Sequence, residues 1–571
     1  MVEVLEHDVV IVGSGLAGLR AAIEASRVSR GKLSVAVVTK TQVMRSHSVS
    51  AEGGTAAVLY PEEGDSFESH IYDTIKGSDF LADQNAVELF VHSAPREIIQ
   101  LEHWGMPWAR REDGRIAQRA FGGMSYPRAC FAEDKVGFFE MQTLYDTALK
   151  WDNITFYQEW FATSLIVEEN RFRGLTAIEM KTGELHAVKA KSCIIATGGA
   201  GRMYTFATFG HSSTPDGLYI AYKAGAPLKD MEFVQFHPTG LVPSGILITE
   251  AARGEGGVLL NAKEERFLKR YAPQKMELAP RDIVSRAMYT EILEGRGVEG
   301  PDGMSHLWLD LTVIEPEKLK RRLAGIREIC VKLAGIDPVN EKIPVRPVAH
   351  YYMGGIHTNI YGATPIAGLW AAGEAACISI NGANRLGSNS TIECLVWGRI
   401  TGEAAARYAM ENGFSSSLPT EQVQKEEKRI FDGLLGKAPR INPYEVKKKM
   451  QRTMESHCHI YRDEKSMIEG LRMIRELKQL PYMGVEDSSR AYNTNLTNVL
   501  EIEAMVNVGE IIVTAALQRR ESRGAHARRD YPKRDDQNWL SHTLIHYTVE
   551  GPELSYAPVH IDKYQPVERK Y

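Results

Sequence analysis

A short polar segment at residues 45–54 contains side chains that could do chemistry on a bound ligand. It carries the imidazole of His47, several serine hydroxyls and the glycine pair Gly53-Gly54. The segment follows the second apolar run of a predicted nucleotide-binding unit, so it lies where the reactive ring of a bound dinucleotide would extend. A lone loop histidine more often hydrogen-bonds to backbone. Here the neighbouring glycines, which allow close approach to a flat ring, favour a histidine that tethers a flavin covalently, because an ordinary nicotinamide-binding domain needs no histidine there.

Arginines, histidines and a threonine hydroxyl recur in five later segments. An arginine can hold a carboxylate through two parallel hydrogen bonds, and imidazole or hydroxyl donors can fix a second carboxylate. Each residue alone could equally form a structural ion pair, but their joint occurrence favours a site for a small dicarboxylate. The segments are residues 235–240, 248–257, 280–282, 350–355 and 384–390.

The elements that must position these residues begin with a strand, a glycine turn and a helix in that order. Apolar residues 8–12 lead into the sequence Gly-Ser-Gly-Leu-Ala-Gly at residues 13–18, and a second apolar strand is expected at residues 33–38. The glycines allow a tight turn, close approach of a pyrophosphate and helix–strand packing, while the helix N-terminus offers donors to phosphate. Thr39 and Lys40 stand where a ribose-binding acid is expected, which counts against a plain NAD site.

Two further junctions between an apolar strand and glycines occur at residues 192–201 and 368–374. They lie far apart in the chain, so we predict one nucleotide-binding domain that closes on itself around an insertion with mixed strand and helix signals. We place this domain at residues 1–235 and 346–415 and the insertion at residues 236–345.

From about residue 416 the sequence changes to long charged helices. We expect a helical domain at residues 416–540, followed by a C-terminal extension at residues 541–571. Five apolar residues of this region recur at helical spacing, which predicts a bundle core rather than a cofactor surface. They are Val499, Ile502, Val506, Val513 and Leu517.

The composition of the chain limits which kinds of partner it can have. The chain has 571 residues, of which 43% are hydrophobic and 25% charged, and its net charge of −5 argues against nucleic acid as the main partner. The six cysteines include no CxxC pair, so no metal site or iron–sulfur cluster held by this chain is expected, and a reducing compartment is favoured. No secretory signal is recognised, and the apolar runs are too short to span a bilayer. A place at a membrane would therefore depend on other chains.

Taken together, these segments resemble the flavoprotein subunit of succinate dehydrogenase and fumarate reductase, the respiratory complex II family. The similar motifs extend almost end to end and are RSHSVSAEGG, ATGGAGRMY, EFVQFHPTG, TEAARGEGG, PRD, AHYYMGGI, ANRLGSNS and ESRGAHAR. The resemblance implies an α/β fold: a Rossmann-like FAD-binding domain, an inserted α+β capping domain that closes on the substrate, and a C-terminal helical domain.

The resemblance also implies a role for individual residues. FAD would be attached covalently through His47, and dicarboxylate contacts would come from His237, Thr249, His350 and Arg385. Arg281 would transfer the proton, with Glu250 and Arg253 as its relay to solvent. The implied cofactor contacts are Gly13, Ser14, Gly15, Leu16, Ala17, Gly18, Thr39, Lys40, Ser46, His47, Ser48, Gly53, Gly54, Asp216, Glu374, Ser390 and Thr391.

This assignment agrees with the chemistry of the reaction. Succinate and fumarate are interconverted by moving a hydride between a substrate carbon and the flavin, and a proton at the adjacent carbon. The acid or base must be held at contact distance and shielded from water. Three residues depart from the usual family pattern: Ala251 replaces glycine, Asn381 replaces histidine near the flavin, and Thr391 replaces leucine.

The favoured interpretation is the catalytic subunit of a succinate:quinone oxidoreductase that passes electrons to an iron–sulfur subunit and then to a quinone in membrane anchor subunits. The same subunit acting as a fumarate reductase is the main alternative, since both directions share these residues. L-aspartate oxidase, which lacks the covalent histidine, and a flavin-dependent nucleic-acid-modifying or non-catalytic binding protein are less favoured. The starting methionine without a transit peptide suggests a peripheral protein on the cytoplasmic side of a prokaryotic plasma membrane.

The helical region and the basic segment at residues 519–529 are expected to form part of the docking surface for partner subunits. An intramolecular face of salt bridges explains the same residues equally well.

Overall fold

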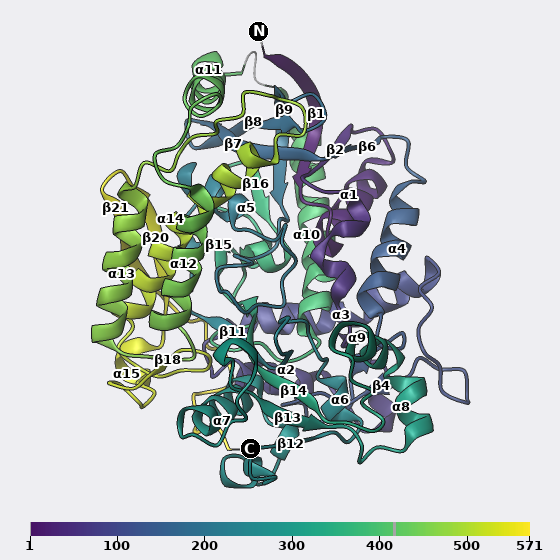
Figure 1. Cartoon of the computed structure of the whole chain (residues 1–571). Helices are drawn as coiled ribbons and strands as arrows, with labels where there is room; N and C mark the ends of the chain where they lie inside the picture. Colours follow the sequence, from purple (N-terminus) through teal and green to yellow (C-terminus); the bar gives the residue numbers. More distant parts are fainter. Residues whose placement is uncertain (1, 415–417, 571) are drawn as a thin grey trace.

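A seven-stranded sheet forms the centre of the molecule, and its parallel part carries the glycine turn (Figure 1). The structure is a computed structural model that describes residues 2–414 and 418–570. The strands follow in the order β6-β2-β1-β9-β8-β7, and β16 also pairs with β9. Their bounds are β1 Glu3–Val12, β2 Val35–Thr39, β6 Ile154–Gln158, β7 Trp160–Glu168, β8 Arg171–Glu179, β9 Glu184–Ile195 and β16 Leu369–Ala371.

The turn from β1 into α1 (Leu16–Ser29) depends on two glycines. Gly13 has a φ of 107°, in the region that favours glycine, and a Cβ on Gly18 would lie 2.0 Å from the Gly13 carbonyl oxygen. The helix can therefore start directly against the strand. Helix α10 (Asn389–Glu411) packs beside α1 on the same face of the sheet (Figure 1). The predicted βαβ unit is confirmed.

The cap is an antiparallel sheet in the order β11-β14-β13-β12, covered by helices. It has an apolar core of its own, separate from that of the central sheet. The predicted boundaries at residues 236 and 345 fall inside β11 and β14, which pair with each other, so the division at these residues stays a proposal. The elements are β11 Val234–Leu241, β12 Val258–Leu260, α7 Arg281–Leu293, β13 Leu307–Asp310, α8 Pro316–Arg322, α9 Ala324–Ala334 and β14 Ile343–Tyr352.

Three long helices form the C-terminal helical domain, with α13 packed against both α12 and α14. They are α12 Pro443–His457, α13 Glu464–Gln479 and α14 Thr494–Gln518. The predicted apolar stripe lies on α14, where Val499, Ile502, Val506 and Val513 are buried and Leu517 is half-buried, so the bundle-core prediction is confirmed. The predicted domain boundary at residue 415 or 416 lies outside the described residues.

The residues expected as a C-terminal extension contribute a hairpin to a second sheet. Strands β20 (Ser541–Thr548) and β21 (Gly551–Pro558) pair with each other, and β20 also pairs with β10 (Leu228–Lys229). The hairpin therefore joins the sheet β17-β15-β10-β20-β21, which also contains β15 (Gly355–His357) and β17 (Ala376–Cys377). Among the helices of residues 2–414 and 418–570, none is both long and apolar enough to cross a membrane.

Candidate active site

A cavity of about 850 Å³ lies between the glycine turn and the cap. The ends of β1, β2 and β9 and the start of α1 line one side, and β11, β14 and the start of α7 line the other. All but two of the predicted site residues line this cavity, the exceptions being Gly18 and Arg253. Gly18 instead packs against the Gly13 carbonyl, and Arg253 is buried behind Glu250.

The glycine turn forms a narrow cradle. A Cβ on Gly15 would lie 3.0 Å from Ser48 Oγ and 3.1 Å from Ser46 Oγ, so a larger residue would crowd the serine hydroxyls. Ser48 Oγ accepts a hydrogen bond from the Leu16 N–H at 3.3 Å, at the start of α1. The N-terminus of α1 and the 45–54 segment are therefore in direct contact, and both line the end of the cavity where a helix N-terminus can bind a phosphate group.

Lys40 forms an ion-paired cluster at the end of the cradle. Its Nζ donates to Asp216 and Glu501, each at 2.9 Å, and to Thr214 Oγ1 at 2.7 Å. Burial lowers the pKa of Lys40, but the two carboxylates more than offset this and hold the pKa above its usual value. Asp216, an expected cofactor contact, thus lines the cavity with its charge already paired to Lys40.

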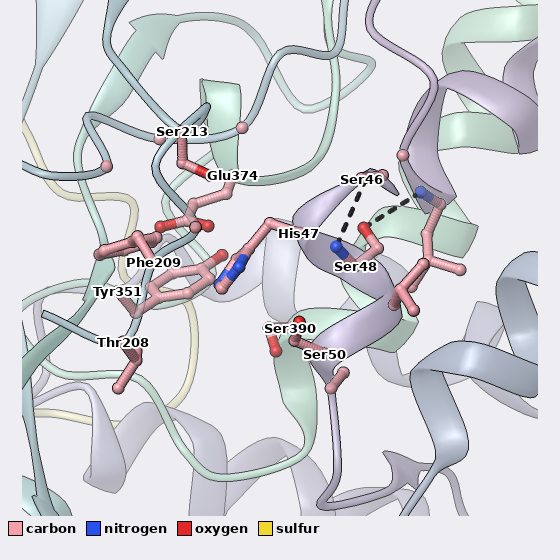
Figure 2. Close-up of a pocket in the computed structure, with 18 of the residues that line it drawn as sticks. Ser46, His47, Ser48, Ser50, Thr208, Phe209, Ser213, Tyr351, Glu374 and Ser390 are labelled. Carbon is pink, nitrogen blue, oxygen red and sulfur yellow. Dashed lines mark hydrogen bonds between the residues drawn. The ribbon is translucent and has the colours of Figure 1, made fainter. Parts of the chain in front are cut away.

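His47 begins a short 3₁₀ turn, η2 (His47–Ser50), and its imidazole points into the cavity (Figure 2). Ser46 caps the turn, because its side chain accepts the Ser48 N–H at 3.4 Å. The His47 ring lies tilted against Phe209, with ring centroids 5.1 Å apart. Burial lowers the pKa of His47 to about 4, so the imidazole is neutral at physiological pH.

Glu374 and Thr391 lie at other parts of the cavity wall. Glu374 Oε1 accepts the Tyr352 N–H at 2.9 Å, and burial raises the pKa of Glu374 to about 8. Thr391 Oγ1 donates to the Gly54 carbonyl at 3.2 Å and lies 2.9 Å from Thr55 Oγ1. The hydroxyl that replaces the usual leucine therefore ties α10 to the second glycine of the 53–54 pair.

Two neutral histidines face each other on neighbouring strands of the cap. The rings of His237 and His350 are 5.0 Å apart, and burial, followed by the charge of Arg281, lowers the pKa of both well below the usual value. His237 Nδ1 accepts the Thr239 N–H at 3.2 Å, so the proton is assigned to Nε2, which has no partner among the described residues. His350 Nδ1 shares a hydrogen bond of 2.9 Å with Thr208 Oγ1.

Arg281, Glu250 and Arg253 form a buried chain leading away from the cavity. Arg281 Nε donates to Glu250 Oε2 at 2.7 Å, and Arg253 Nη2 lies 3.7 Å from the same oxygen. Burial raises the pKa of Glu250, but Arg281 and Arg253 more than offset it and hold the pKa below its usual value. Burial also lowers the pKa of Arg253. Glu250 is thus a charged carboxylate between two buried cations.

Arg385 completes the polar end of the cavity. Its guanidinium lies 4.2 Å from the centre of the Tyr351 ring, Nη1 donates to Ser390 Oγ at 3.0 Å, and Nε has no partner among the described residues. Burial, followed by the charge of Arg281, lowers the pKa of Arg385 to about 10. We call Glu250, Arg253, Arg281 and Arg385 the cavity cluster.

Asn381, the second departure from the family pattern, supports this end of the cavity indirectly. Its Nδ2 donates to Glu393 Oε2 at 2.8 Å, and the same oxygen accepts the Tyr351 hydroxyl at 2.8 Å. Asn381 therefore helps to fix the ring on which Arg385 lies.

Several residues that contact the site were given no role in the sequence analysis. The Phe121 ring packs so close to Gly53 and Gly387 that a side chain at either glycine would collide with it. The Gly122 N–H donates to Glu250, and Gln235 Oε1 accepts from Arg281 Nη1 at 3.1 Å. An aromatic residue followed by two glycines, as at residues 121–123, was the available signal. No sequence pattern marks Gln235 apart from its place two residues before His237.

The donor set and shape of the cavity fit FAD and a dicarboxylate. Its volume lies within the range of about 300–1,000 Å³ usual for ligand sites. The glycine cradle excludes larger side chains at the helix N-terminus, which suits a pyrophosphate. At the other end, His237 Nε2 and Arg385 Nε are buried donors without a protein partner among the described residues, which suits carboxylate oxygens.

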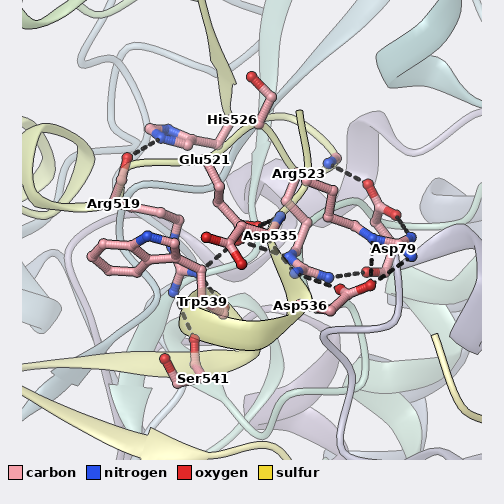
Figure 3. A network of polar contacts seen from close by, with 12 residues as sticks. Asp79, Arg519, Glu521, Arg523, His526, Asp535, Asp536, Trp539 and Ser541 are labelled. Atoms are coloured by element: carbon pink, nitrogen blue, oxygen red, sulfur yellow. Dashed lines mark hydrogen bonds and ion pairs between the residues drawn. The ribbon is translucent and has the colours of Figure 1, made fainter. Parts of the chain in front are cut away.

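The basic segment at residues 519–529 lies away from this cavity and is mostly buried (Figure 3). Arg519 pairs with Glu232 at 2.7 Å and with Glu521 at 3.0 Å, and Arg523 pairs with Glu521 and Asp536, each at 2.8 Å. We call these five residues the scaffold cluster. Arg519, Arg523 and Arg528 are each at most 1% exposed, so the expectation that the segment is a docking surface is wrong for these three residues. Their guanidinium groups are hydrogen-bonded to carboxylates and backbone carbonyls inside the protein.

Comparison with known proteins gives matches along nearly the whole chain. A family described as FAD binding domain matches residues 8–391, and one described as Fumarate reductase flavoprotein C-term matches residues 447–571. The chain is 47% identical to a fumarate reductase flavoprotein subunit of Mycobacterium tuberculosis, covering 99% of both chains. It is 43% identical to a succinate dehydrogenase flavoprotein subunit of Rickettsia conorii, covering 99% of this chain and 98% of the relative. A solved structure of a mutant E. coli quinol fumarate reductase matches with a TM-score of 0.96 at 41% identity, covering 99% of both chains.

Proposed function

Because this chain belongs to the flavoprotein subunit family of succinate dehydrogenase and fumarate reductase, we propose that it interconverts succinate and fumarate as the catalytic subunit of a succinate:quinone oxidoreductase. The observation that carries this proposal is the polar end of the cavity. There Arg281, Arg385 and two neutral histidines face the space beside the glycine cradle. Few ligands other than a small dianion next to a redox cofactor would use such a set.

The proposed cofactor contacts divide the cavity by chemistry. Gly13, Gly15 and the start of α1 would hold the pyrophosphate, and Glu374, which follows β16, would contact the cofactor through its carboxyl. The segment around His47 and the 53–54 glycine pair would lie along the flavin ring. When bound, FAD supplies two-electron redox chemistry.

His47 is the proposed covalent attachment point. Its imidazole is neutral, with a pKa of about 4, and therefore has a nitrogen lone pair available for a covalent bond. The 3₁₀ turn and Phe209 fix the direction of the ring toward the cavity (Figure 2).

The dicarboxylate would be held at both ends before any proton moves. Arg385 presents its unpartnered Nε to one carboxylate, and His237 Nε2, His350 and the Thr249 hydroxyl are placed for the other. Closure of the cap would keep water from the reacting carbons.

Arg281 is the proposed proton donor and acceptor. The guanidinium lies at the cavity wall, and its Nε–H is already hydrogen-bonded to Glu250. Beyond Glu250, Arg253 Nη2 lies 3.7 Å from Glu250 Oε2 as an ion pair, and Arg253 Nη1 donates to the Glu277 carbonyl. The Glu277 side chain pairs with Arg266, which is 41% exposed, so this series of charged groups leads toward the surface. Glu250 and Arg253 would therefore reset the proton of Arg281 from solvent.

The direction of the reaction is the finer part of the proposal. Succinate oxidation is the direction favoured from the sequence, whereas the 47% identical relative is named a fumarate reductase, which supports the reverse as a second candidate. Paired rates on the assembled complex distinguish them: succinate oxidation with an artificial dye and fumarate reduction with a reduced viologen. A strong excess of the second rate would overturn succinate oxidation.

Covalent attachment has a test that does not depend on activity. After acid denaturation of the purified protein, flavin fluorescence should remain with the polypeptide, and a His47→Ser control should release it. Release from the unchanged protein, together with oxidation of L-aspartate, would instead favour L-aspartate oxidase.

The remaining proposals concern the assembly. We place electron transfer from FAD to an iron–sulfur subunit and from there to membrane anchor subunits, with the chain peripheral on the cytoplasmic side of a prokaryotic plasma membrane. This is supported by relatives that are subunits of quinol-fumarate reductase. Co-purification of an iron–sulfur subunit with the chain tests it.

A further inference from the structure

The first turn of α7 places Arg281 at the cavity, yet no side chain caps this helix at its N-terminus. The next residue, Asp282, has a fully buried side chain. Two arginines from outside this turn hold its carboxylate: Arg569 Nη2 lies 2.6 Å from Asp282 Oδ2, and Arg286 Nη2 donates to the same oxygen at 3.0 Å. The position of the helix start therefore depends on ion pairs rather than on a cap.

Arg569 connects the cap to the nucleotide-binding domain. The same Nη2 lies 3.1 Å from Asp79 Oδ2, in the loop after α2 (Phe67–Gly77). Its side chain is 8% exposed, so solvent screens these pairs little. One guanidinium thus bridges two carboxylates that belong to different domains.

Asp79 is hydrogen-bonded to the basic segment at residues 519–529 and to Arg534 (Figure 3). The Gly524 N–H donates to Asp79 Oδ2 at 2.8 Å, Arg523 Nη1 donates to its backbone carbonyl at 2.9 Å, and Arg534 Nη1 donates to Oδ1 at 2.8 Å. In addition, Arg286 Nη1 donates to the Gly524 carbonyl. The buried basic segment and the start of α7 are therefore parts of one continuous network.

The tail that carries Arg569 is anchored before it reaches the cap. Gln84 Oε1 accepts the backbone N–H groups of residues 562–564, and Gln84 Nε2 donates to the Tyr564 carbonyl at 2.6 Å. Lys563 pairs with Glu68 on the surface. These contacts all reach the nucleotide-binding domain, and Arg569 then joins the tail to the cap through Asp282.

We propose that Arg569 is a positioning residue, which fixes the first turn of α7 through Asp282 and so holds Arg281 at the cavity. The inference rests on the proposed function for its effect on turnover, since Arg569 itself does not line the cavity. A displacement of about 1 Å of a reacting group can cost roughly a hundredfold in rate, so loss of this bridge should act mainly on kcat.

The test compares Arg569→Met with Lys563→Met in the holoenzyme. Lys563→Met removes an exposed ion pair of the same tail, 63% and 52% exposed at its two residues, without touching the cap. For Arg569→Met we expect hydrogen exchange of the α7 amides to become at least tenfold faster. We also expect kcat to fall ten- to a hundredfold, KM to change less than threefold and FAD content to stay the same. Lys563→Met should change none of these, and Arg569→Lys should recover part of the loss.

A double variant separates positioning from general damage. If Arg569 acts through Asp282, adding Asp282→Asn to Arg569→Met should lower kcat little further. Equal α7 exchange in Arg569→Met and Lys563→Met would overturn the proposal, and so would faster exchange spread equally over α14. Absence of succinate and fumarate turnover in the unchanged protein would overturn the proposed function instead, while the exchange comparison would still decide the role of Arg569.

Discussion

The cavity cluster and the scaffold cluster are both built mainly from buried arginines and glutamates, but they differ in how many N–H groups of their arginines have a protein partner. Arg519 in the scaffold cluster uses its five N–H groups on Glu232, Glu521, Thr543 and two backbone carbonyls. Within the described residues, Arg281 makes two such bonds, to Glu250 and Gln235. The cavity cluster thus keeps donors available for a ligand.

The pKa is lowered for Arg385 of the cavity cluster and raised for Arg519 of the scaffold cluster. Burial, followed by the charge of Arg281, lowers the pKa of Arg385 to about 10. Burial also acts on Arg519, but Glu232 and Glu521 more than offset it and raise the pKa of Arg519 above its usual value. Arg519, which supports the fold, has a protein partner for each of its N–H groups, whereas Arg385 keeps its Nε without a partner among the described residues, as a ligand site requires.

The largest expected effect is on turnover, from Arg281→Lys. Lysine can still donate to Glu250 and Gln235, so the free energy of unfolding should change little. It cannot present the guanidinium at the cavity wall, and we expect kcat to fall about 10²–10⁴-fold, the usual contribution of a positioned acid or base. The measurement is kcat with a dye acceptor at matched FAD content. Turnover within tenfold of the unchanged enzyme would remove Arg281 from the chemistry.

Arginine to lysine in the scaffold cluster, at position 519, should lower the free energy of unfolding and leave kcat unchanged. Lysine at position 519 has three N–H donors for five acceptors, so at least two of the five hydrogen bonds are lost. At about 1–3 kcal/mol each, the free energy of unfolding should fall by about 2–6 kcal/mol. Urea denaturation of Arg519→Lys measures this, and kcat per folded molecule should stay the same. An unchanged urea midpoint, or a folded protein that has lost turnover, would contradict the distinction.

Histidines near the two clusters should change the stability of the protein in opposite pH ranges. His542, next to the scaffold cluster, pairs with Asp230 and Asp83, and these carboxylates overcome burial to raise the pKa of His542 to about 9. Its stabilising contribution is therefore complete below the unfolded pKa of about 6.5 and is lost as pH rises through 9. His237 and His350 have lowered pKa values, so their neutral burial costs stability as pH falls below about 6.5.

Urea midpoints between pH 5 and 9.5 measure both slopes. A His542→Gln variant should lose the alkaline slope alone, and a His350→Gln variant should lose part of the acidic one. An alkaline slope that persists in His542→Gln would show that another group carries it.

The smallest effect is expected from Arg529→Glu. Arg528 is buried and saturated, whereas the neighbouring Arg529 is exposed and lies 5.0 Å from the centre of the Tyr461 ring. Its reversal should change the free energy of unfolding by less than about 0.5 kcal/mol. If Arg529 takes no part in docking, quinone reduction by the assembled complex should also stay within twofold of the unchanged rate. A loss of quinone reduction with intact dye reduction would return this edge of the segment to the docking surface.

The fold class was predictable because each domain leaves a local pattern in the sequence. The glycine turn after β1, the separated strand-to-glycine junctions and the apolar stripe of α14 predicted a nucleotide-binding domain with an insertion and a helical domain. The family resemblance identified the first two as an FAD-binding domain and a cap, which the family match and the solved structure confirm. The positions at which strands pass between domains were not predictable, because β11 and β14 continue through the boundary without a change of residue type.

Most candidate site residues were predictable because they stand in motifs with distinctive neighbours, and the structure brings them to one cavity. Phe121 was missed, and Gln235 and Tyr351 were given no role although they lie in the predicted segments, since their contribution comes only from tertiary contact. The basic segment was misjudged because sequence shows charge but not the carboxylates that meet it, such as Glu232, almost 290 residues away.

The central sheet has a consequence for how the chain folds during synthesis. Strand β9 pairs with β1 on one side and with β16 on the other, yet β1 ends at Val12 and β16 ends at Ala371. At about 5–20 residues per second, roughly 20–70 s pass between the appearance of these two strands on the ribosome. Through that interval the apolar strands β1 and β2 exist without the complete sheet, and the cofactor cavity can close only after the whole cap has been made.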